Sequence, residues 1–311
     1  MIFTADFVTF VLPFRRKGHT MEYSFFSYRP SDLERIPPRP AQSHKGTFGR
    51  VLVIGGSPCM SGAAYFSAKA AYRTGAGLVH ILTHKDNRII LQSTLPEAIL
   101  SVYGDQPESE KAQILDAVER ADVIVIGIGL GQSTGARDLL ETVLANADVP
   151  LVVDADALNL IAKEPSLLDA ASAPIIVTPH IAEMARLCER SVPEILADKV
   201  EYATRFAEQN ALICVLKDHE TVVACGNTDD NSIYINKSGN SGMATGGSGD
   251  VLTGVIAALV AQGMEPFDAA TLGVYIHGLA GDAAADELGE YSVMASDIIN
   301  HISAVIKDCQ E

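Results

Sequence analysis

The sequence predicts an α/β fold in which a mostly parallel sheet is covered by helices on both faces. From Arg50 onward, short apolar runs alternate with longer segments of helical periodicity. The short runs are apolar at successive positions, as expected for strands that are buried on both faces. No Pro/Ser/Gly-rich linker divides the chain and no internal repeat is visible. We therefore expect a single domain over residues 41–311, preceded by a partly disordered N-terminal extension, residues 1–40.

The predicted strands are rich in β-branched residues, and most of them end in glycine or a polar residue. In chain order they lie in "RVLVIGG" (50–56), "LVHILT" (78–83), "DVIVIGIGLG" (122–131), "PLVVDADALNLIA" (150–162, a strand entering a helix), "APIIVTPHIAEMARLCE" (173–189, the same arrangement) and "ALICVLKD" (211–218). The segments "ETVVACG" (220–226) and "SIYINK" (232–237) are predicted to form a small antiparallel pair.

The predicted helices are long, rich in alanine and leucine, and often stopped by glycine. They lie at residues 61–77, 109–121, 136–147, 199–210, 250–263, 267–288 and 296–308. Ligands of such sheets bind beyond the carboxyl ends of the strands, so the loops there are the places to look for function.

Charge and composition exclude several function classes. The chain has 23 Lys and Arg against 39 Asp and Glu, a net charge of −16, which argues against a nucleic-acid or anionic-membrane partner. The first twenty residues are too short and too interrupted for a membrane span, and their basic residues follow the apolar stretch, unlike a signal peptide. Met21 is an alternative start. Five scattered cysteines without a CxxC spacing indicate a reducing, cytoplasmic setting.

The segment "NKSGNSGMATGGSGDVLTG" (236–254) is the most informative stretch of the chain. Gly246, Gly247 and Gly249 directly precede a predicted helix that starts near Asp250. Unhindered backbone N–H groups at a helix N-terminus form a cradle for an anion such as phosphate. A carboxylate beside such a cradle is placed to take a proton from a hydroxyl that attacks the phosphate. An acidic helix cap is an equally good reading of Asp250 from the residues alone.

Six segments occur in an order that resembles the ADP/ATP-dependent NAD(P)H-hydrate dehydratases of the ribokinase-like superfamily. They are "KGTFGRVLVIGGS", "SGAA", "GIGLG", "DADALN", "TPHIAEM" and "GNSGMATGGSGDVLTG", and the similarity spans residues 44–305. The resemblance implies a hydro-lyase of metabolite repair that restores NADH or NADPH from the S epimer of NADHX or NADPHX. The ring hydroxyl would be phosphorylated and then lost as phosphate, yielding AMP from ADP or ADP from ATP. It also implies Mg²⁺, a homo-oligomer such as a tetramer, and a separate NAD(P)HX epimerase, because the extension is too short to hold a fused one.

The resemblance also assigns roles to individual residues. Asp250 would be the catalytic base, and Gly246, Gly247 and Gly249 would hold the transferred phosphate. Residues expected to bind the hydrated cofactor are Ala63, Gly129, Asp156, His180 and Asp250. Residues expected to bind the nucleotide are Lys217, Asp218, His219, Glu220, Thr221, Asn240, Gly246 and Gly249. Glu183 would hold Mg²⁺ through water.

Several of these residues have plainer readings that stay open at this level. Lys217 could be a solvated charge, Glu183 a first-turn acid that favours its helix dipole, and Asp154 and Asp156 polar strand-end caps. Asp218 departs from the glycine that commonly follows the lysine in the family, and its charge could repel a nucleotide phosphate. Two other functions compete with the dehydratase: a ribokinase-fold kinase of a small alcohol such as a thiazole or hydroxymethylpyrimidine, and a nucleotide sensor without turnover.

Overall fold

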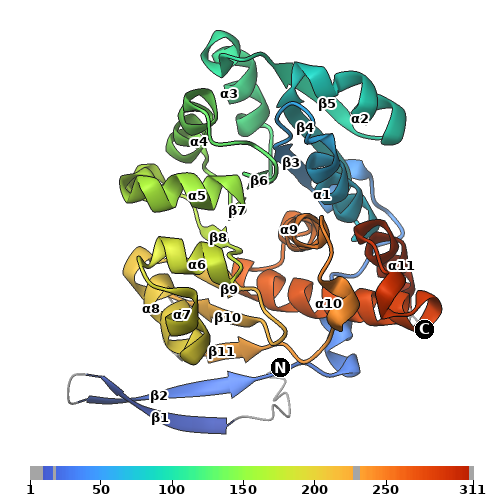
Figure 1. Ribbon diagram of the computed structural model, residues 1–311. Coiled ribbons are helices and arrows are strands. Elements are labelled where there is room, and N and C mark those ends of the chain that lie inside the picture. The colour runs from blue at the N-terminus through green and yellow to red at the C-terminus, as the bar shows by residue number, and fades with distance from the viewer. Residues whose placement is uncertain (1–9, 17–18, 227–231, 308–311) are drawn as a thin grey trace.

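The protein is described by a computed structural model over residues 10–16, 19–226 and 232–307 (Figure 1). In these ranges eleven strands form one sheet in the order β1-β2-β11-β10-β9-β8-β7-β6-β3-β4-β5. Their bounds are β1 Phe10–Arg16, β2 His19–Phe26, β3 Arg50–Ile54, β4 Leu78–His84, β5 Ile99–Tyr103, β6 Val123–Ile126, β7 Leu151–Val153, β8 Ile175–Val177, β9 Ile213–Leu216, β10 Val222–Cys225 and β11 Ser232–Ile235. All neighbours from β9 to β5 pair in parallel, whereas β10 is antiparallel to both β9 and β11.

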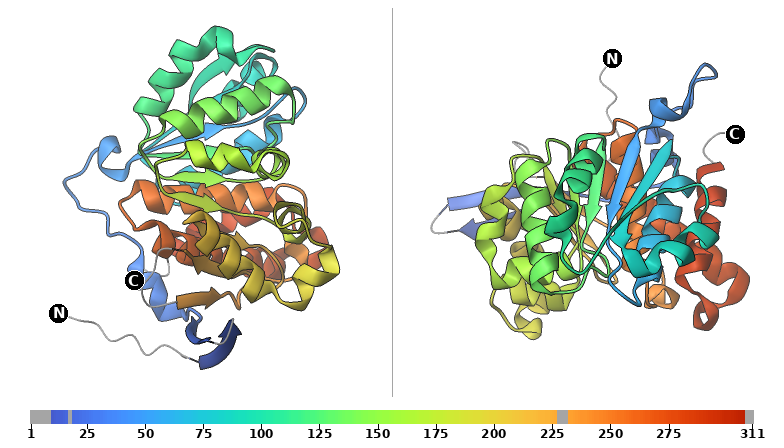
Figure 2. Two further views of the ribbon diagram at one scale, coloured as in Figure 1. Left: turned by 90° about the vertical axis from the view of Figure 1, so that its left-hand side faces the viewer. Right: turned by 90° about the horizontal axis from the view of Figure 1, so that it is seen from above.

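Helices cover both faces of this sheet, as predicted (Figures 1 and 2). One face carries α1 Ser61–Arg73, α2 Arg88–Thr94, α9 Ser248–Ala261, α10 Pro266–Leu288 and α11 Ala295–Lys307. The other carries α3 Lys111–Glu119, α4 Thr134–Asn146, α5 Asp156–Lys163, α6 Ile181–Leu187, α7 Val192–Ala197 and α8 Lys199–Asn210. In the part of the chain that the structure describes, no helix is long and apolar enough to cross a membrane.

The strands are apolar throughout because each supplies side chains to two cores. In β3, Val51 and Val53 pack on the α1, α9 and α10 side, whereas Leu52 and Ile54 pack on the α3–α8 side. Successive side chains of a strand point to opposite faces, so a sheet buried on both sides needs an unbroken apolar run.

The predicted strands and helices are confirmed, including the antiparallel pair β10–β11. The strands β1, β2 and β5 and the helices α2 and α7 were not predicted. The two helices and β5 are five to seven residues long. The strands β1 and β2 are seven and eight residues long, and β2 pairs with β1 on one side and, through Ser24 and Ser232, with β11 on the other, more than 200 positions away in the chain. A local pattern holds no trace of such a partner.

The segment that follows β2 packs onto the domain. Tyr28 is buried, its hydroxyl lies 2.9 Å from Thr271 Oγ1, and its ring contacts those of Tyr234 and Tyr275. Leu33 belongs to the same core. The expected extension therefore contributes to the folded body at residues 19–26, 28 and 33, and residues 1–9 and 17–18 lie outside the described part. The boundary at residue 41 stays a prediction.

The strand order contains one reversal that positions the site. From β3 the chain proceeds outward to β4 and β5, and it then returns to β6 on the other side of β3. The loops after β3 and β6 meet at this switch point, where the backbone N–H of Ser57 donates to the carbonyl of Gly129 at 2.6 Å. The carboxyl edge at such a switch point is the usual ligand position in open α/β sheets. The ends of β7, β8 and β9 continue along the same edge.

Candidate active site

The glycine-rich segment ends at the N-terminus of α9, which begins at Ser248. Gly247 is the N-cap residue with φ +92°, and a Cβ there would lie 2.7 Å from the ring of Phe66. Both the backbone conformation and the space therefore require glycine. A Cβ at Gly246 would meet nothing within 4 Å, so that position is open. Gly249 and Asp250 lie in the first turn, where backbone N–H groups have no partner within the helix.

A partly buried ion pair lies directly against this turn. Lys217, at the end of β9, donates from Nζ to both oxygens of Asp154, at the end of β7, at 2.8 and 3.0 Å. A Cβ at Gly249 would lie 3.3 Å from Lys217 Nζ and 3.6 Å from Asp154 Oδ2. Three segments that are distant in sequence therefore meet at one point, and glycine lets the helix N-terminus approach the pair.

Asp250 has the properties of a general base at this point. Burial raises the pKa of its carboxyl to about 7, Asp154 contributes to the rise, and Lys217 counteracts part of it. A carboxyl with a pKa near neutrality can both hold and release a proton at physiological pH. The N-cap position of α9 is held by Gly247 and not by Asp250, and no side chain caps the helix there. The role of Asp250 as the catalytic base stays a prediction.

His180 and Glu183 form a reciprocal cap at the start of α6. The backbone N–H of His180 donates to Glu183 Oε2 at 2.8 Å, while His180 Nδ1 accepts from the backbone N–H of Ala182 at 3.0 Å. This places the ring proton of neutral His180 on Nε2, which lies 3.4 Å from Glu183 Oε1. Burial, followed by the charge of Lys217, lowers the pKa of His180 and favours its neutral form. Burial raises the pKa of Glu183 to about 7, although Lys217 offsets part of the rise.

Two predicted cofactor-binding residues meet at the switch point. Gly129, in the loop after β6, has φ +55°, and a Cβ there would lie 3.0 Å from the Cβ of Ala63 in α1. Asp156 serves the same loop: Oδ2 accepts from the backbone N–H of Gly131 at 2.8 Å, and Oδ1 accepts from Gln132 Nε2 at 3.1 Å. Asp156 therefore fixes the conformation of the loop that carries Gly129.

The predicted nucleotide segment 217–221 is a tight loop between β9 and β10. The Thr221 hydroxyl donates to the carbonyl of Asp218 at 3.1 Å and the residue is buried, so the loop would offer a ligand its backbone more readily than this side chain. His219 is exposed, and Glu220 pairs with Lys237. These positions border Lys217 along the chain.

The charge of Asp218 is neutralised within the protein. Lys199 Nζ donates to its Oδ2 at 2.7 Å, and His219 Nδ1 lies 3.2 Å from the same oxygen. Partial burial alone would raise the pKa of Asp218, but these bonds outweigh it and the pKa is lowered. Lys199, which no sequence pattern connects with the loop, thus offsets the negative charge of Asp218 within the protein. The effect of Asp218 on nucleotide binding stays a prediction.

Asn240 lies at the far side of the glycine segment. Its side chain accepts from the backbone N–H of Gly242 at 3.0 Å and donates to Asp282 in α10 at 2.9 Å. The structure thus anchors the glycine segment to α10 through Asn240, and the residue's part in nucleotide binding stays a prediction.

Sequence reasoning assigned Asp154 too small a role. As a strand-end residue it suggests a polar cap, yet it is 2% exposed, forms the partner of Lys217, and acts on the charges of both Asp250 and Glu183. Its place directly after a buried strand was the available signal. Its partner could not be inferred, because Lys217 lies 63 positions away in the chain.

Comparison with known proteins agrees with this arrangement. Residues 51–304 match the family described as NAD(P)H-hydrate dehydratase. The bifunctional NAD(P)H-hydrate repair enzyme Nnr of Moorella thermoacetica is 39% identical over 282 residues, which are 89% of this chain and 53% of that protein. The ADP-dependent (S)-NAD(P)H-hydrate dehydratase of Neisseria meningitidis serogroup B is 39% identical over 256 residues, 81% of this chain and 82% of that protein. The chain thus spans about half the length of the bifunctional relatives.

Solved structures show the same fold. A ribokinase-like superfamily protein from Enterococcus faecalis superimposes with a TM-score of 0.81 at 31% identity, covering 92% of this chain and 96% of the other. The ADP/ATP-dependent NAD(P)H-hydrate dehydratase of Bacillus subtilis, co-crystallised with ATP and Mg²⁺, superimposes with a TM-score of 0.79 at 32% identity, covering 90% and 97%. With its ribokinase-like fold and matching sequence, the chain belongs to the NAD(P)H-hydrate dehydratase family.

Proposed function

We propose that this chain dehydrates the S epimer of NADHX and NADPHX, with ADP or ATP as phosphoryl donor. The observation that carries the proposal is the meeting of Asp250, the first turn of α9 and Lys217 at the carboxyl edge of the sheet. A base, a set of backbone donors and a fixed cation are the parts that phosphoryl transfer to a hydroxyl requires.

The residues divide the chemistry as follows. Asp250 takes the proton of the ring hydroxyl while the hydroxyl oxygen bonds to the terminal phosphorus of the nucleotide and the bond to the remaining nucleotide breaks. The N–H groups of the first turn of α9, with Lys217 beside Gly249, hold the transferred phosphoryl oxygens. The carbon–oxygen bond to the ring then breaks and phosphate leaves, because it is a far better leaving group than hydroxide. The neighbouring ring carbon loses a proton to solvent, and the electrons of that C–H bond form the ring double bond that restores the dihydropyridine.

The described residues fit Mg²⁺ only as a companion of the nucleotide. They contain no group of three His, Cys, Asp or Glu side chains suited to hold a metal ion. Glu183 accepts a backbone N–H at one oxygen, and its raised pKa disfavours the carboxylate form that a metal needs. Mg²⁺ retains several waters and is commonly carried on phosphates, so Glu183 would act on it through water. The metal would neutralise phosphate charge during transfer.

Cofactor and nucleotide would approach this centre from different loops. Ala63, Gly129 and His180 border the part of the carboxyl edge where the hydrated ring would lie, and Asp156 keeps the Gly129 loop in place. Residues 217–221 would hold the nucleotide mainly through backbone groups, with Asn240 on the opposite side.

We also propose a functional partner, an oligomeric state and a location for the protein. The partner is a separate NAD(P)HX epimerase, the state is a homo-oligomer such as a tetramer, and the location is cytoplasmic. Cys59, Cys188 and Cys214 are free thiols, which suits a reducing compartment.

Recovery of reduced-nicotinamide absorbance from purified NADHX tests this function. The assay compares ADP, ATP and no nucleotide in the presence of Mg²⁺, for the wild type and Asp250→Asn. We expect recovery that depends on nucleotide and falls at least about 100-fold in the variant. An absence of recovery with either nucleotide would refute the proposal and direct the search to an alcohol kinase that releases a stable phosphorylated product.

A further inference from the structure

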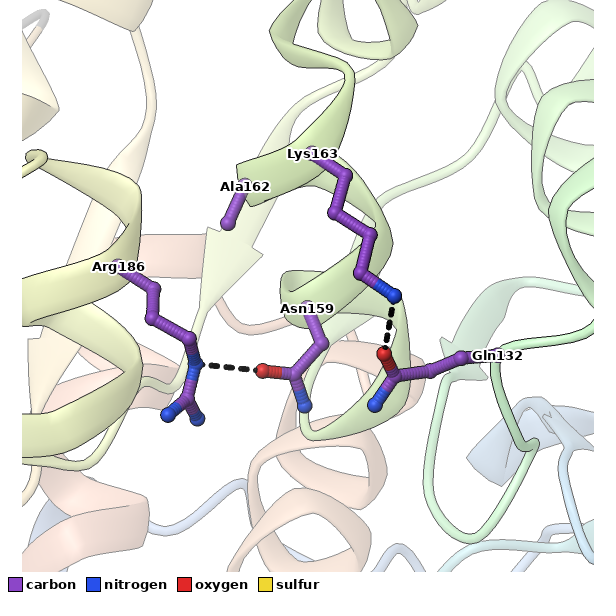
Figure 3. Close-up of a pocket in the computed structure, with 5 residues that line it drawn as sticks. All are labelled: Gln132, Asn159, Ala162, Lys163 and Arg186. Atoms are coloured by element: carbon purple, nitrogen blue, oxygen red, sulfur yellow. Dashed lines mark hydrogen bonds between the residues drawn. The ribbon is translucent and has the colours of Figure 1, made fainter.

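A basic pocket lies outside the centre described above, between the loop after β6 and helices α5 and α6. It has a volume of about 530 Å³ and is lined by Gln132, Asn159, Ala162, Lys163 and Arg186 (Figure 3). None of these lining residues is acidic, although the chain as a whole carries a net charge of −16. The two cations stand on either side of Asn159.

Both cations are held by neutral amides. Lys163 Nζ donates to Gln132 Oε1 at 2.7 Å, and Arg186 Nε donates to Asn159 Oδ1 at 2.8 Å, as the dashed lines of Figure 3 show. Among the residues that the structure describes, neither cation forms an ion pair with a carboxylate. Arg137 on the neighbouring helix, by contrast, is engaged by Glu141 and Glu164. The pocket thus presents positive charge that an external anion could neutralise.

The pocket is connected to the candidate cofactor site. Gln132 donates to Asp156 and accepts from Lys163, so it links the Gly129 loop to the pocket. Helix α6 begins directly after His180 and carries Arg186 six positions further, about 9 Å along the axis at 1.5 Å per residue. In a dinucleotide whose nicotinamide ring lies near His180, the adenosine end lies at least about this far from the ring. The adenosine end can therefore reach Arg186.

We propose that this pocket binds the 2′-phosphate of NADPHX, so that Lys163 and Arg186 make the protein prefer NADPHX over NADHX. The two substrates differ by that phosphate alone. A phosphomonoester accepts two parallel bonds from a guanidinium, and Arg186 has its Nη atoms available for them in the described structure. The proposal deepens the function proposed above and rests on it for the identity of the substrate.

Binding of NADP⁺ and NAD⁺, measured by calorimetry, tests the pocket without turnover. The proteins compared are the wild type, Arg186→Gln, Lys163→Gln and the control Lys111→Gln, which removes an exposed charge paired with Glu108. We expect Arg186→Gln and Lys163→Gln to weaken NADP⁺ binding about tenfold or more, while NAD⁺ binding changes less than about twofold. The control should change neither. In the turnover assay, Arg186→Gln and Lys163→Gln should lower kcat/KM for NADPHX and leave kcat/KM for NADHX unchanged.

Four outcomes would overturn the pocket assignment. One is an equal loss for both dinucleotides, and another is no loss for either. The third is binding of inorganic phosphate that Arg186→Gln abolishes while NADP⁺ binding is unchanged, since it would assign the pocket to a free anion. Turnover of both hydrates without discrimination would leave the proposed function standing and refute the pocket. Preferential NADP⁺ binding without turnover of either hydrate would support the pocket and refute the proposed function.

Discussion

The raised pKa of Asp250 makes the stability of the protein depend on pH in a defined direction. The pKa of the folded state is about 7 against an ordinary value of 3.8, because of burial, then Asp154, with partial relief from Lys217. The folded protein therefore retains a proton that the unfolded chain has already released. Stability from this group is fully present below the unfolded pKa and is lost as the pH rises through about 7. Asp250→Asn keeps the shape of the side chain and removes the titration.

The magnitude follows from the same two values. At 1.36 kcal/mol per pKa unit, a change from 3.8 to about 7 corresponds to roughly 4 kcal/mol above pH 7. Part of this loss of stability has already occurred at pH 5, so less remains to be lost between pH 5 and pH 8. The carboxyl also retains some contact with solvent, which makes the total loss smaller. We therefore expect Asp250→Asn to gain about 1–3 kcal/mol over the wild type between pH 5 and pH 8. In a domain of this size that is a few degrees in Tm, on the order of 2 °C per kcal/mol.

Thermal unfolding of both proteins at pH 5, 6, 7 and 8 measures this difference. Asp169→Asn, the same substitution at an exposed position, is the matched control and should run parallel to the wild type at every pH. The gap in Tm between Asp250→Asn and the wild type should widen as the pH rises. Parallel curves for all three proteins would refute the reasoning, because they would show that Asp250 titrates alike in the folded and unfolded states.

The remaining predictions concern packing around the site and the N-terminal segment. Lys217→Met leaves the buried Asp154 carboxylate without its cation and should lower the free energy of unfolding by about 2–4 kcal/mol in chemical denaturation. Adding Asp154→Asn should recover part of that loss. Additive losses from the two substitutions would contradict the ion pair. Gly247→Ala should lower the free energy of unfolding by about 1–3 kcal/mol, because a Cβ there meets the Phe66 ring. Gly246→Ala is the control, since its Cβ would have open space, and its Tm should stay within about a degree of the wild type. Equal Tm values for the two variants would show that the protein relieves the contact with Phe66. Tyr28→Ala should lower the free energy of unfolding by about 3 kcal/mol in chemical denaturation, because it removes a buried aromatic ring. An unchanged free energy of unfolding would show that the N-terminal segment does not pack on the folded body.

The sequence by itself determined the class of fold, because the evidence for it is local. A strand buried on both faces must be apolar at successive positions, and β3 and β6 show this directly in their residues. Glycines before a helix likewise indicate an open N-terminus, so the residues alone predict the cradle at Gly247 and Gly249. The family followed from the order of such segments.

The tertiary structure decided which charges meet. Asp154, Lys217 and Asp250 come from three separate segments, and their proximity depends on the strand order and on the close approach that Gly249 permits. The role of β2 depends on pairing with β11 in the same way. Burial and electrostatic coupling are properties of such long-range neighbours and not of residue types, so a sequence can nominate a carboxylate but only the fold can set its pKa.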